Sequence, residues 1–215
     1  MTILTEKDGF TYAMLDAKDG DDVVELIAQG FTDGSEPTAL ALGLGPEHLK
    51  QFAEALLPKF LGEGLSIVAR DAQTGEIAGA QLNDEVSMDL PIDPSQFEWA
   101  IPVLALAGDV YGRYFHGEPP KPKESFHIFI IGVSRSFRGK DIGQRLIDLS
   151  LDLARSRGYK KAVVEASGII SQHIFRKAGF TTRVEIPYST FEHEGKRPFE
   201  NTGVHPSMML MDKLL

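Results

Sequence analysis

The pattern of hydrophobic and polar positions predicts a chain of mixed strands and helices. Residues 10–15, 65–71 and 76–83 read as strands, and a short turn joins the last two into a hairpin. Residues 19–31 and 45–57 instead carry apolar side chains three and four positions apart, which predicts two amphipathic helices. The first half of the chain is therefore expected to combine a sheet with helices packed against it.

Two prolines set expected limits to helices. Pro58 lacks a backbone N–H and should end or kink the helix that begins near residue 45. Residues 94–115 have a helical pattern that Pro102 interrupts. Residues 116–125 are rich in proline and are expected to form a loop.

The second half of the chain begins with a nearly continuous apolar run, FHIFIIGV, at residues 126–133. Such a run is typical of a central strand buried on both faces, and Gly132 within it suggests a bulge or a close backbone approach. The later expected elements are helix 141–158, strand 160–167, helix 170–179, and strands 180–191 and 205–215. No repeat or linker divides the chain, so residues 1–215 are expected to form a single domain of mixed α/β class.

Composition excludes several functional classes. Apolar residues make up 42% and charged residues 25%, as in a soluble globular protein. The net charge, 22 minus 31 or −9, disfavours nucleic acid as a partner and fits a cationic small substrate better. The absence of cysteine excludes disulfides, Cys-ligated zinc and Cys nucleophiles. Without a signal-peptide pattern or a run of about 18 apolar residues, we expect a cytoplasmic protein that does not bind membranes.

A strand, a short loop and a helix follow one another in VSRSFRGKDIGQRLI, residues 133–147. The unpaired N–H groups and the dipole at such a helix start form an anion site. The glycines and the lysine do not follow the order of a nucleotide-binding P-loop or of a dinucleotide-binding motif. Two glycines and two cations still suit a pyrophosphate, and the alternative from the loop alone is an ordinary turn with solvated charges.

This loop resembles the acetyl-CoA loop of the GNAT acetyltransferases, Arg/Gln-x-x-Gly-x-Gly/Ala. It matches at Arg138 and Gly143 and departs at Asp141, where the family usually has glycine. A second element, SQHIFRKAGF at residues 171–180, follows at the expected spacing. Residues 35–43, 64–84 and 166–180 resemble, more narrowly, the arylalkylamine N-acetyltransferase branch, which includes dopamine N-acetyltransferase-like proteins.

The resemblance implies a mixed, mostly antiparallel and splayed sheet with helices on both faces. Backbone groups of Ile131 and Val133 would pair with the pantetheine arm of acetyl-CoA, and Gly132 would mark a bulge with an N–H free for the thioester oxygen. A splay between the central strand and strand 160–166 would admit the cofactor. The pyrophosphate would lie on the N–H groups of Arg138, Gly139, Lys140, Asp141, Ile142 and Gly143.

Asp141 conflicts with this implied site, because a carboxylate close to a pyrophosphate is repelled by about a few kcal/mol before screening. Two arrangements would relieve the repulsion. The side chain could point outward and cap the helix, or it could pair with Arg138 or Lys140. The expected cost is weaker cofactor binding.

Acetyl transfer to an alkylamine needs a base, since an amine with a pKa near 10.4 is only on the order of 0.1% neutral at pH 7. Glu36 matches the acidic residue that acts as this base, through water, in the arylalkylamine branch; the alternative is an ordinary surface glutamate. Ser167 and Ser171 match two serines assigned there to substrate contact and thiolate protonation. Ser171 could instead cap a helix, and Tyr188 is a third possible acid, since Phe175 replaces the tyrosine of many GNAT enzymes.

The remaining candidates concern metals and the acceptor. The six histidines have no metal-binding spacing, so no metal is expected; His127 opens the central strand and could line the acceptor cavity. The aromatic residues within 97–115 could form a lid over an aromatic amine or simply pack a helix face. The function expected is acetyl-CoA-dependent N-acetylation of a small amine by a monomer or homodimer. The alternatives are another acceptor (a polyamine, a drug or a lysine side chain) and a CoA-binding module without turnover.

Overall fold

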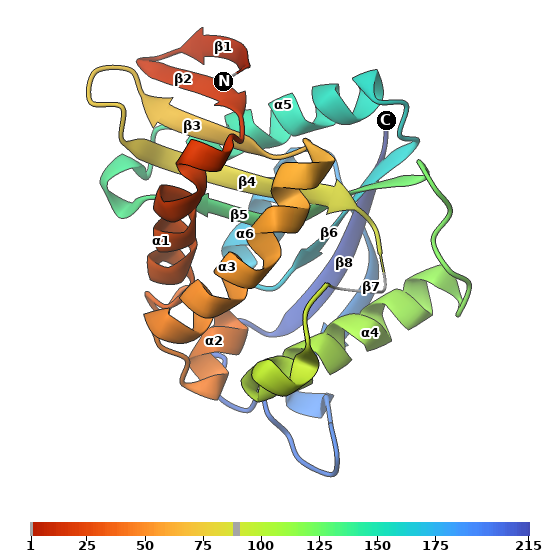
Figure 1. Ribbon diagram of the computed structural model, residues 1–215. Coiled ribbons are helices and arrows are strands. Elements are labelled where there is room, and N and C mark those ends of the chain that lie inside the picture. The colour runs from red at the N-terminus through yellow and green to blue at the C-terminus, as the bar shows by residue number, and fades with distance from the viewer. Residues whose placement is uncertain (1, 88–90) are drawn as a thin grey trace.

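One eight-stranded sheet runs through the computed structural model, which describes residues 2–87 and 91–215 (Figure 1). Its strand order is β1-β2-β3-β4-β5-β6-β8-β7, and every neighbouring pair is antiparallel except β5 and β6. The strands are β1 (Ile3–Lys7), β2 (Phe10–Met14), β3 (Ile67–Asp71), β4 (Ile77–Glu85), β5 (Ser125–Val133), β6 (Lys161–Ala166), β7 (Thr181–Pro187) and β8 (Ser207–Leu214).

Helices cover both faces of this sheet, as Figure 1 shows. On one face α1 and α3 pack over β3, β4 and β5, and α4 packs over β6, β7 and β8; α5 and α6 pack on the other face. The helices are α1 (Gly20–Phe31), α2 (Pro37–Leu42), α3 (Pro46–Glu63), α4 (Ile101–Phe115), α5 (Ile142–Ser156) and α6 (Ile169–Lys177). The expected mixed, mostly antiparallel sheet with helices on both faces is confirmed.

The pairing of β5 opens a wedge in the middle of the sheet. β5 pairs with β4 as far as Val133, but its parallel ladder with β6 covers only Ser125 to Ile128. One extra residue, Phe129, interrupts the β4–β5 register, because Leu82 faces Ile130 and the next residue of β4 faces Ile128. Beyond Ile128 the strands diverge, so the edge of β5 that faces β6 has no strand partner there.

The expectation of a bulge at Gly132 is therefore wrong in its position. Gly132 faces Ala80 in regular register, and the irregularity lies three residues earlier at Phe129. The bulge lies where the two hydrogen-bond ladders of β5 cease to run together. The ladder of β5 with β6 ends at Ile128, whereas its ladder with β4 continues. Packing does not require a glycine at this position, because a Cβ at Gly132 would make an ordinary contact with the Leu26 side chain, at 3.9 Å.

Both prolines behave differently from the expectation. Pro58 lies inside α3, which continues to Glu63; of the two expected outcomes, an end or a kink, the end at Pro58 is wrong. The turn beyond it is held by the fully buried Phe60 and by the ion pair of Lys59 with Glu63, which offset one lost backbone hydrogen bond. Pro102 does not interrupt a helix but stands in the first turn of α4, where its missing N–H costs nothing.

Two elements were not expected from the sequence. β1 is largely exposed and has no buried stripe, so its pattern carries no strand signal. The six-residue helix α2 is too short to show helical periodicity, and it begins at Pro37 directly after Glu36. β1 is held by its pairing with β2, and α2 is held by its N-cap at Glu36. Neither element depends on an amphipathic pattern.

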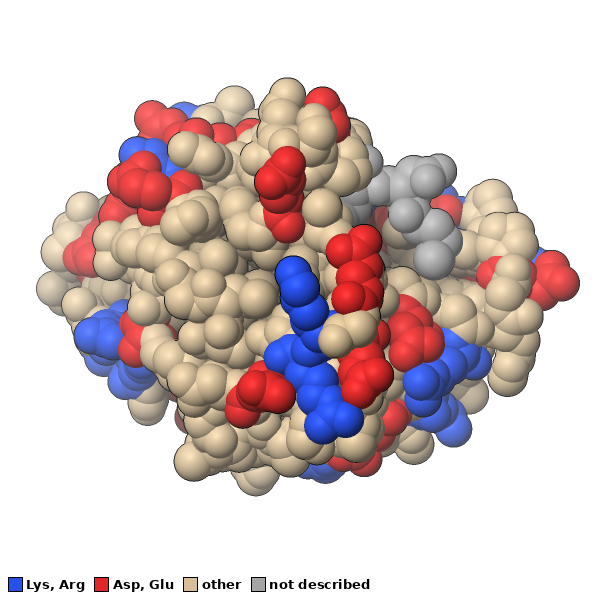
Figure 2. All heavy atoms as spheres, turned by 90° about the horizontal axis from the view of Figure 1, so that it is seen from below, with Lys and Arg blue, Asp and Glu red and all other residues tan. Residues whose placement is uncertain are grey.

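The charged surface shows no basic patch on the face seen from below Figure 1. Figure 2 shows that the Lys and Arg side chains on this face lie directly beside Asp and Glu side chains. That arrangement gives a polyanion no continuous positive surface there. Among the described residues, no helix is long and apolar enough to span a membrane.

Candidate active site

A cavity of about 520 Å³ fills the wedge between β5 and β6 and reaches the starts of α5 and α6. We call it the wedge cavity. Its lining includes most of the residues that the sequence marked for the cofactor: Ile131, Gly132, Val133, Arg138, Gly139, Asp141, Ile142 and Gly143. Lys140 is the exception, because its ammonium group lies over the rings of Phe10 and Phe137, at 5.6 and 5.2 Å from their centres.

The loop before α5 lines this cavity and leads into a helix start, where backbone N–H groups lack intrahelical partners. Gly139 has φ +80° and Asp141 has φ +55°, so the chain turns through two left-handed residues before the helix begins. Asp141 is the N-cap residue, but its side chain makes no cap hydrogen bond. The first-turn N–H groups of α5 therefore keep their capacity to bind an anion.

Neither of the two arrangements expected for Asp141 is observed. Its carboxylate makes no cap hydrogen bond to the first turn, and its backbone is left-handed, with φ +55°. Arg138 is instead paired with Asp33, at 2.7 Å, and Lys140 lies over the aromatic rings. The exposed Asp141 carboxylate thus remains at the rim of the wedge cavity.

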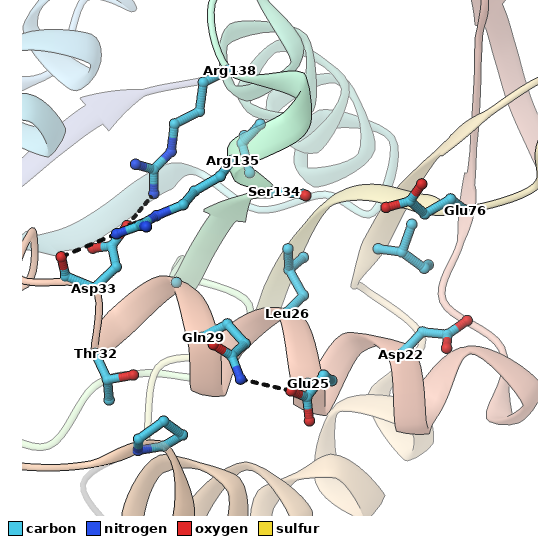
Figure 3. Close-up of a pocket in the computed structure, with 14 residues that line it drawn as sticks. Asp22, Glu25, Leu26, Gln29, Thr32, Asp33, Glu76, Ser134, Arg135 and Arg138 are labelled. Carbon is cyan, nitrogen blue, oxygen red and sulfur yellow. Dashed lines mark hydrogen bonds and ion pairs between the residues drawn. The ribbon is translucent and has the colours of Figure 1, made fainter.

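Arg138 is tied to the segment that carries Glu36. Arg135 and Arg138 both reach from the loop after β5 to the buried carboxylate of Asp33, as Figure 3 shows. Burial raises the pKa of Asp33, but hydrogen bonds from Ser35 and from the two arginines outweigh it and hold the pKa at about 2. These contacts close one end of a cleft of about 550 Å³ beside α1.

A second cavity, of about 450 Å³, lies between the sheet, α3 and α4. We call it the α3–α4 cavity. Most of its wall is apolar or aromatic, with Phe52 from α3 and Trp99 from the turn before α4 packed edge to face at 5.6 Å. The aromatic residues within 97–115 are thus divided between two roles. Trp99 and Tyr111 line the cavity, and Tyr111 also belongs to the cluster beneath α4, against which Tyr114 and Phe115 pack.

Glu36 lies where the two cavities meet. It is not the exposed loop residue of the alternative interpretation, because only 9% of it is accessible. Its Oε2 accepts hydrogen bonds from the Ala39 N–H at 2.6 Å and the Thr38 hydroxyl at 2.8 Å, so it caps α2. Burial raises the pKa of Glu36, and the hydrogen bonds from Ala39, Thr38 and Ser167 offset only part of that effect.

The serines lie on the same side of the wedge cavity. Ser167 lines both cavities and hydrogen-bonds Glu36. Ser171 lines the wedge cavity at the third position of α6, where its hydroxyl accepts from the Gly168 N–H and donates to the Gly168 carbonyl. It supports the helix start without being the N-cap, which is Gly168.

The Tyr188 hydroxyl is bonded to the backbone and is not free to act as an acid. Its ring is buried, and its hydroxyl donates to the Ser167 carbonyl at 2.7 Å. Burial, with the charge of Glu36, raises the pKa of Tyr188 far above its ordinary value. Its contact therefore positions the Ser167 backbone beside Glu36. Phe175 is fully buried against Phe180, at 5.2 Å between ring centres.

A chain of buried ionisable groups lies along one wall of the α3–α4 cavity. Lys59 pairs with Asp84, whose Oδ1 lies 2.7 Å from His127 Nδ1. His127 Nε2 lies 2.8 Å from Glu165 Oε2 and 3.2 Å from the Tyr111 hydroxyl. The five residues come from α3, β4, β5, β6 and α4, so this network connects the helices to the centre of the sheet.

The network favours the protonated form of His127. Burial alone lowers the pKa of His127, but the charges of Glu165 and Asp84 outweigh it and raise the pKa to about 10. Burial likewise raises the pKa of Asp84, and the neighbouring His127 and Lys59 outweigh it and lower the pKa below its usual range. His127, expected only as a possible lining residue, is thus a buried cation that lines the cavity.

Sequence reasoning missed Lys59, Asp84 and Glu165, and it expected Tyr111 only as one of the aromatic residues of a possible lid. The available signal was an acidic residue inside each of two apolar strand patterns, AGAQLND and KAVVEA. Charged residues in buried strands are rare unless they are paired. Each of these two acidic residues therefore predicts a buried partner of opposite charge. No group of residues in the described ranges 2–87 and 91–215 has the arrangement of a metal site.

One family model and several solved structures are similar to this chain. Residues 96–180 match the model of the acetyltransferase (GNAT) family. Arylalkylamine N-acetyltransferase 2 from Aedes aegypti is similar in structure, with 27% identity and a TM-score of 0.76, over 96% of this chain and 99% of that one.

Two further structures share the fold at lower identity. The polyamine N-acetyltransferase of Drosophila melanogaster, which forms N-acetylagmatine, is 17% identical with a TM-score of 0.75, over 96% of this chain and 100% of that one. The C-terminal condensation domain of Ebony, solved with beta-alanyl-dopamine, is 16% identical with a TM-score of 0.82, over 96% of this chain and 99% of that one.

Proposed function

Since the chain carries an N-acetyltransferase domain of the GNAT family, we propose that it transfers an acetyl group from acetyl-CoA to the primary amine of a small arylalkylamine. The observation that carries the proposal is the meeting of two cavities at Glu36 and Ser167. One cavity follows the unpaired edge of β5 and the start of α5, and the other is walled by aromatic residues. Two substrates held in them would meet at a buried carboxylate.

The wedge cavity suits the pantetheine and pyrophosphate groups of acetyl-CoA. Backbone groups of Ile131 and Val133, which face no strand on the β6 side, would pair with the pantetheine amides. First-turn N–H groups of α5 and the Arg138 guanidinium would hold the pyrophosphate. Arg138 would have to leave Asp33 to do so. Acetyl-CoA supplies the acetyl group as a thioester.

Glu36 is the proposed base. It removes a proton from the acceptor ammonium through water, and its raised pKa brings it closer to the working pH than an exposed carboxylate would be. His127 is another titratable group in the lining of the α3–α4 cavity, but with a pKa of about 10 it already carries its proton at neutral pH. Glu36 is thus the better-suited acceptor of the proton.

The thioester end needs a donor for the developing oxyanion and a proton for the thiolate. Backbone N–H groups around the bulge at Phe129, which lines both cavities, are the proposed oxyanion donors in place of Gly132. The Ser171 hydroxyl is the proposed acid, because Phe175 has no proton to give and Tyr188 is bonded to Ser167. Thiolates leave readily, so Ser171 is expected to matter less than Glu36.

Two observations bear on the acceptor. The aromatic wall formed by Phe52 and Trp99 favours a ring-bearing amine. The carboxylates of Glu36, Asp84 and Glu165 on the same cavity favour, as a second candidate, an acceptor with more than one cationic group, such as a polyamine. The aromatic wall carries the preference, since two of the three carboxylates already contact the His127 cation.

Thiol release from acetyl-CoA tests the proposal. The purified protein is assayed with dopamine, tyramine, tryptamine, spermidine and a lysine peptide. We expect the arylalkylamines to give the highest kcat/KM. Turnover with spermidine or the peptide alone would mean that the acceptor is not an arylalkylamine. CoA binding without thiol release in the presence of any amine would support a non-catalytic module.

Replacing Asp141 by glycine is expected to strengthen acetyl-CoA binding. Glycine has no Cβ penalty at φ +55° and removes a carboxylate from the rim of the proposed pyrophosphate site. A gain of about 1 kcal/mol corresponds to a KM for acetyl-CoA about fivefold lower. Asp141→Asn is the matched control, because it removes the charge and keeps a side chain that tolerates this backbone. An unchanged or higher KM in Asp141→Gly would show that the carboxylate does not oppose binding.

A further inference from the structure

Glu165 is the second carboxylate at the junction of the two cavities. It stands near the end of β6 and lines both the wedge cavity and the α3–α4 cavity, as Glu36 and Ser167 do. Its side chain is 14% accessible. The proposed mechanism gives it no role, and the sequence resemblance assigns it none.

One oxygen of Glu165 is held and the other is not. Oε2 lies 2.8 Å from His127 Nε2. Oε1 is buried and has no hydrogen-bond partner within bonding distance among the described residues, and the Tyr111 hydroxyl is the second donor that lies close to the Glu165 carboxyl group. A buried carboxylate oxygen without a donor is costly, so a ligand that brings an N–H group to it regains the lost hydrogen bond.

The position of Glu165 is fixed from behind by the ionic network. Lys59, Asp84 and His127 alternate between cation and anion, and each is mostly buried. Their hydrogen bonds anchor the Glu165 carboxyl group through Oε2 and leave Oε1 as its free acceptor. An acceptor held so rigidly can bind a donor with little loss of side-chain entropy.

The charges that line the α3–α4 cavity favour a cation. Its carboxylates are Glu36, Asp84 and Glu165, and its cation is the protonated His127. With Lys59 behind the wall added, the local sum is still negative. A primary ammonium, with three N–H donors and one positive charge, satisfies both the free oxygen and the charge balance.

We propose that Glu165 Oε1 binds the ammonium group of the acceptor, so that the site selects amines over neutral nucleophiles. Glu165 is thus a specificity-determining residue, and Glu36 removes the proton from the amine that Glu165 has bound. The inference rests on the proposed function for the identity of the ligand. An alternative partner for Oε1 is an amide N–H of pantetheine, because Glu165 also lines the wedge cavity.

The test compares an amine with its neutral isostere. Equilibrium titrations on the CoA complex give the affinities for tyramine and for 4-(2-hydroxyethyl)phenol, in which a hydroxyl replaces the ammonium group. We expect the wild-type protein to prefer tyramine by tenfold or more. In Glu165→Gln the preference should fall to about onefold, while the affinity for CoA changes by less than twofold. Glu165→Asp keeps the charge and should keep part of the preference.

Glu85→Gln is the matched control. Glu85 is a hydrogen-bonded, partly buried carboxylate at the end of β4 that lines neither cavity. It should leave the preference unchanged. A wild-type preference that persists in Glu165→Gln would overturn the inference, as would a loss of CoA affinity with the amine preference intact. Because binding is measured without turnover, these outcomes stay distinct from a failure of the proposed function, which would be absent thiol release.

Discussion

Glu36→Gln is expected to reduce kcat/KM for the amine by about 10²- to 10⁴-fold near neutral pH, the range typical of a lost general base. Glutamine can still accept the hydrogen bond from the Ala39 N–H that caps α2, so the fold should persist. What it cannot do is take a proton from the acceptor ammonium. The effect is therefore expected on turnover, with acetyl-CoA binding preserved.

The pH dependence separates this role from a merely structural one. Burial raises the pKa of Glu36, so wild-type activity should fall as the pH drops through that value and the carboxylate becomes protonated. Glu36→Gln should lose this limb and gain rate steadily toward the pKa of the amine, where free amine becomes abundant. Glu54→Gln, on an exposed position of α3, is the control and should match the wild type. An unchanged pH–rate profile in Glu36→Gln would contradict the base role.

Asp84→Ala is expected to lower the free energy of unfolding by about 3 to 5 kcal/mol, the typical cost of removing one partner from a buried ion pair. Without Asp84, the cations of Lys59 and His127 would face each other in the interior. For a chain of this length the change corresponds to a fall in Tm of roughly 6 to 20 °C. Asp109→Ala, which breaks an exposed pair with Arg113 on α4, should cost about 0.5 kcal/mol or less.

The same network predicts how stability varies with pH. The pKa of His127 is raised from 6.5 to about 10, so its contribution is complete below pH 6.5 and is lost as the pH rises through 10. The pKa of Asp84 is lowered, so its contribution is present above the ordinary value of 3.8 and is lost as the pH falls through the lowered value. The network is therefore most stabilising between pH 3.8 and 6.5.

Thermal unfolding across this range checks the sign. The difference in Tm between the wild type and His127→Gln should shrink as the pH rises from 6.5 to 10, because only the wild type loses a stabilising charge. The groups that face His127 are Asp84, Glu165 and Tyr111, with Lys59 behind Asp84. A difference in Tm that stays constant or grows over this range would mean that His127 is not protonated in the folded protein.

The sequence predicts well those parts of the site that depend on local order. The apolar run of β5, the glycine-bearing loop and the helix α5 follow one another along the chain, so a strand–loop–helix anion site needs no long-range information. The residues that this reasoning selected line one cavity, with Lys140 as the exception. Lys140 differs because a neighbouring pair of aromatic rings, which the loop sequence does not reveal, holds its ammonium group.

The parts that depend on pairing register could not be read from the sequence. The bulge lies at Phe129 because the β5–β6 ladder ends at Ile128, and that end is set by strands far apart along the chain. Asp84 and Glu165 flank His127 only because β4 and β6 pair with β5 in one register. A shift of one residue would turn these carboxylates to the other face of the sheet.

For Glu36, neither the burial of the side chain nor its raised pKa could be predicted from the local sequence. Its place in a Gly- and Pro-bounded loop predicts an exposed side chain, yet Glu36 is the N-cap residue of the short helix α2 and is buried. Burial then changes its chemistry, since it raises the pKa of a carboxyl group that would otherwise be ionised at any physiological pH. Resemblance pointed to the residue, and the structure supplies the physical reason why it is suited to act as a base.

A crystal structure with CoA and tyramine tests most directly the claim that two cavities bring the substrates together at Glu36. The account predicts the pantetheine arm along Ile131 and Val133, the thiol near Phe129, and the tyramine nitrogen between Glu36 and Glu165 with its ring against Trp99. Tyramine bound outside the α3–α4 cavity, or a nitrogen separated from the thiol by the ring, would contradict the account.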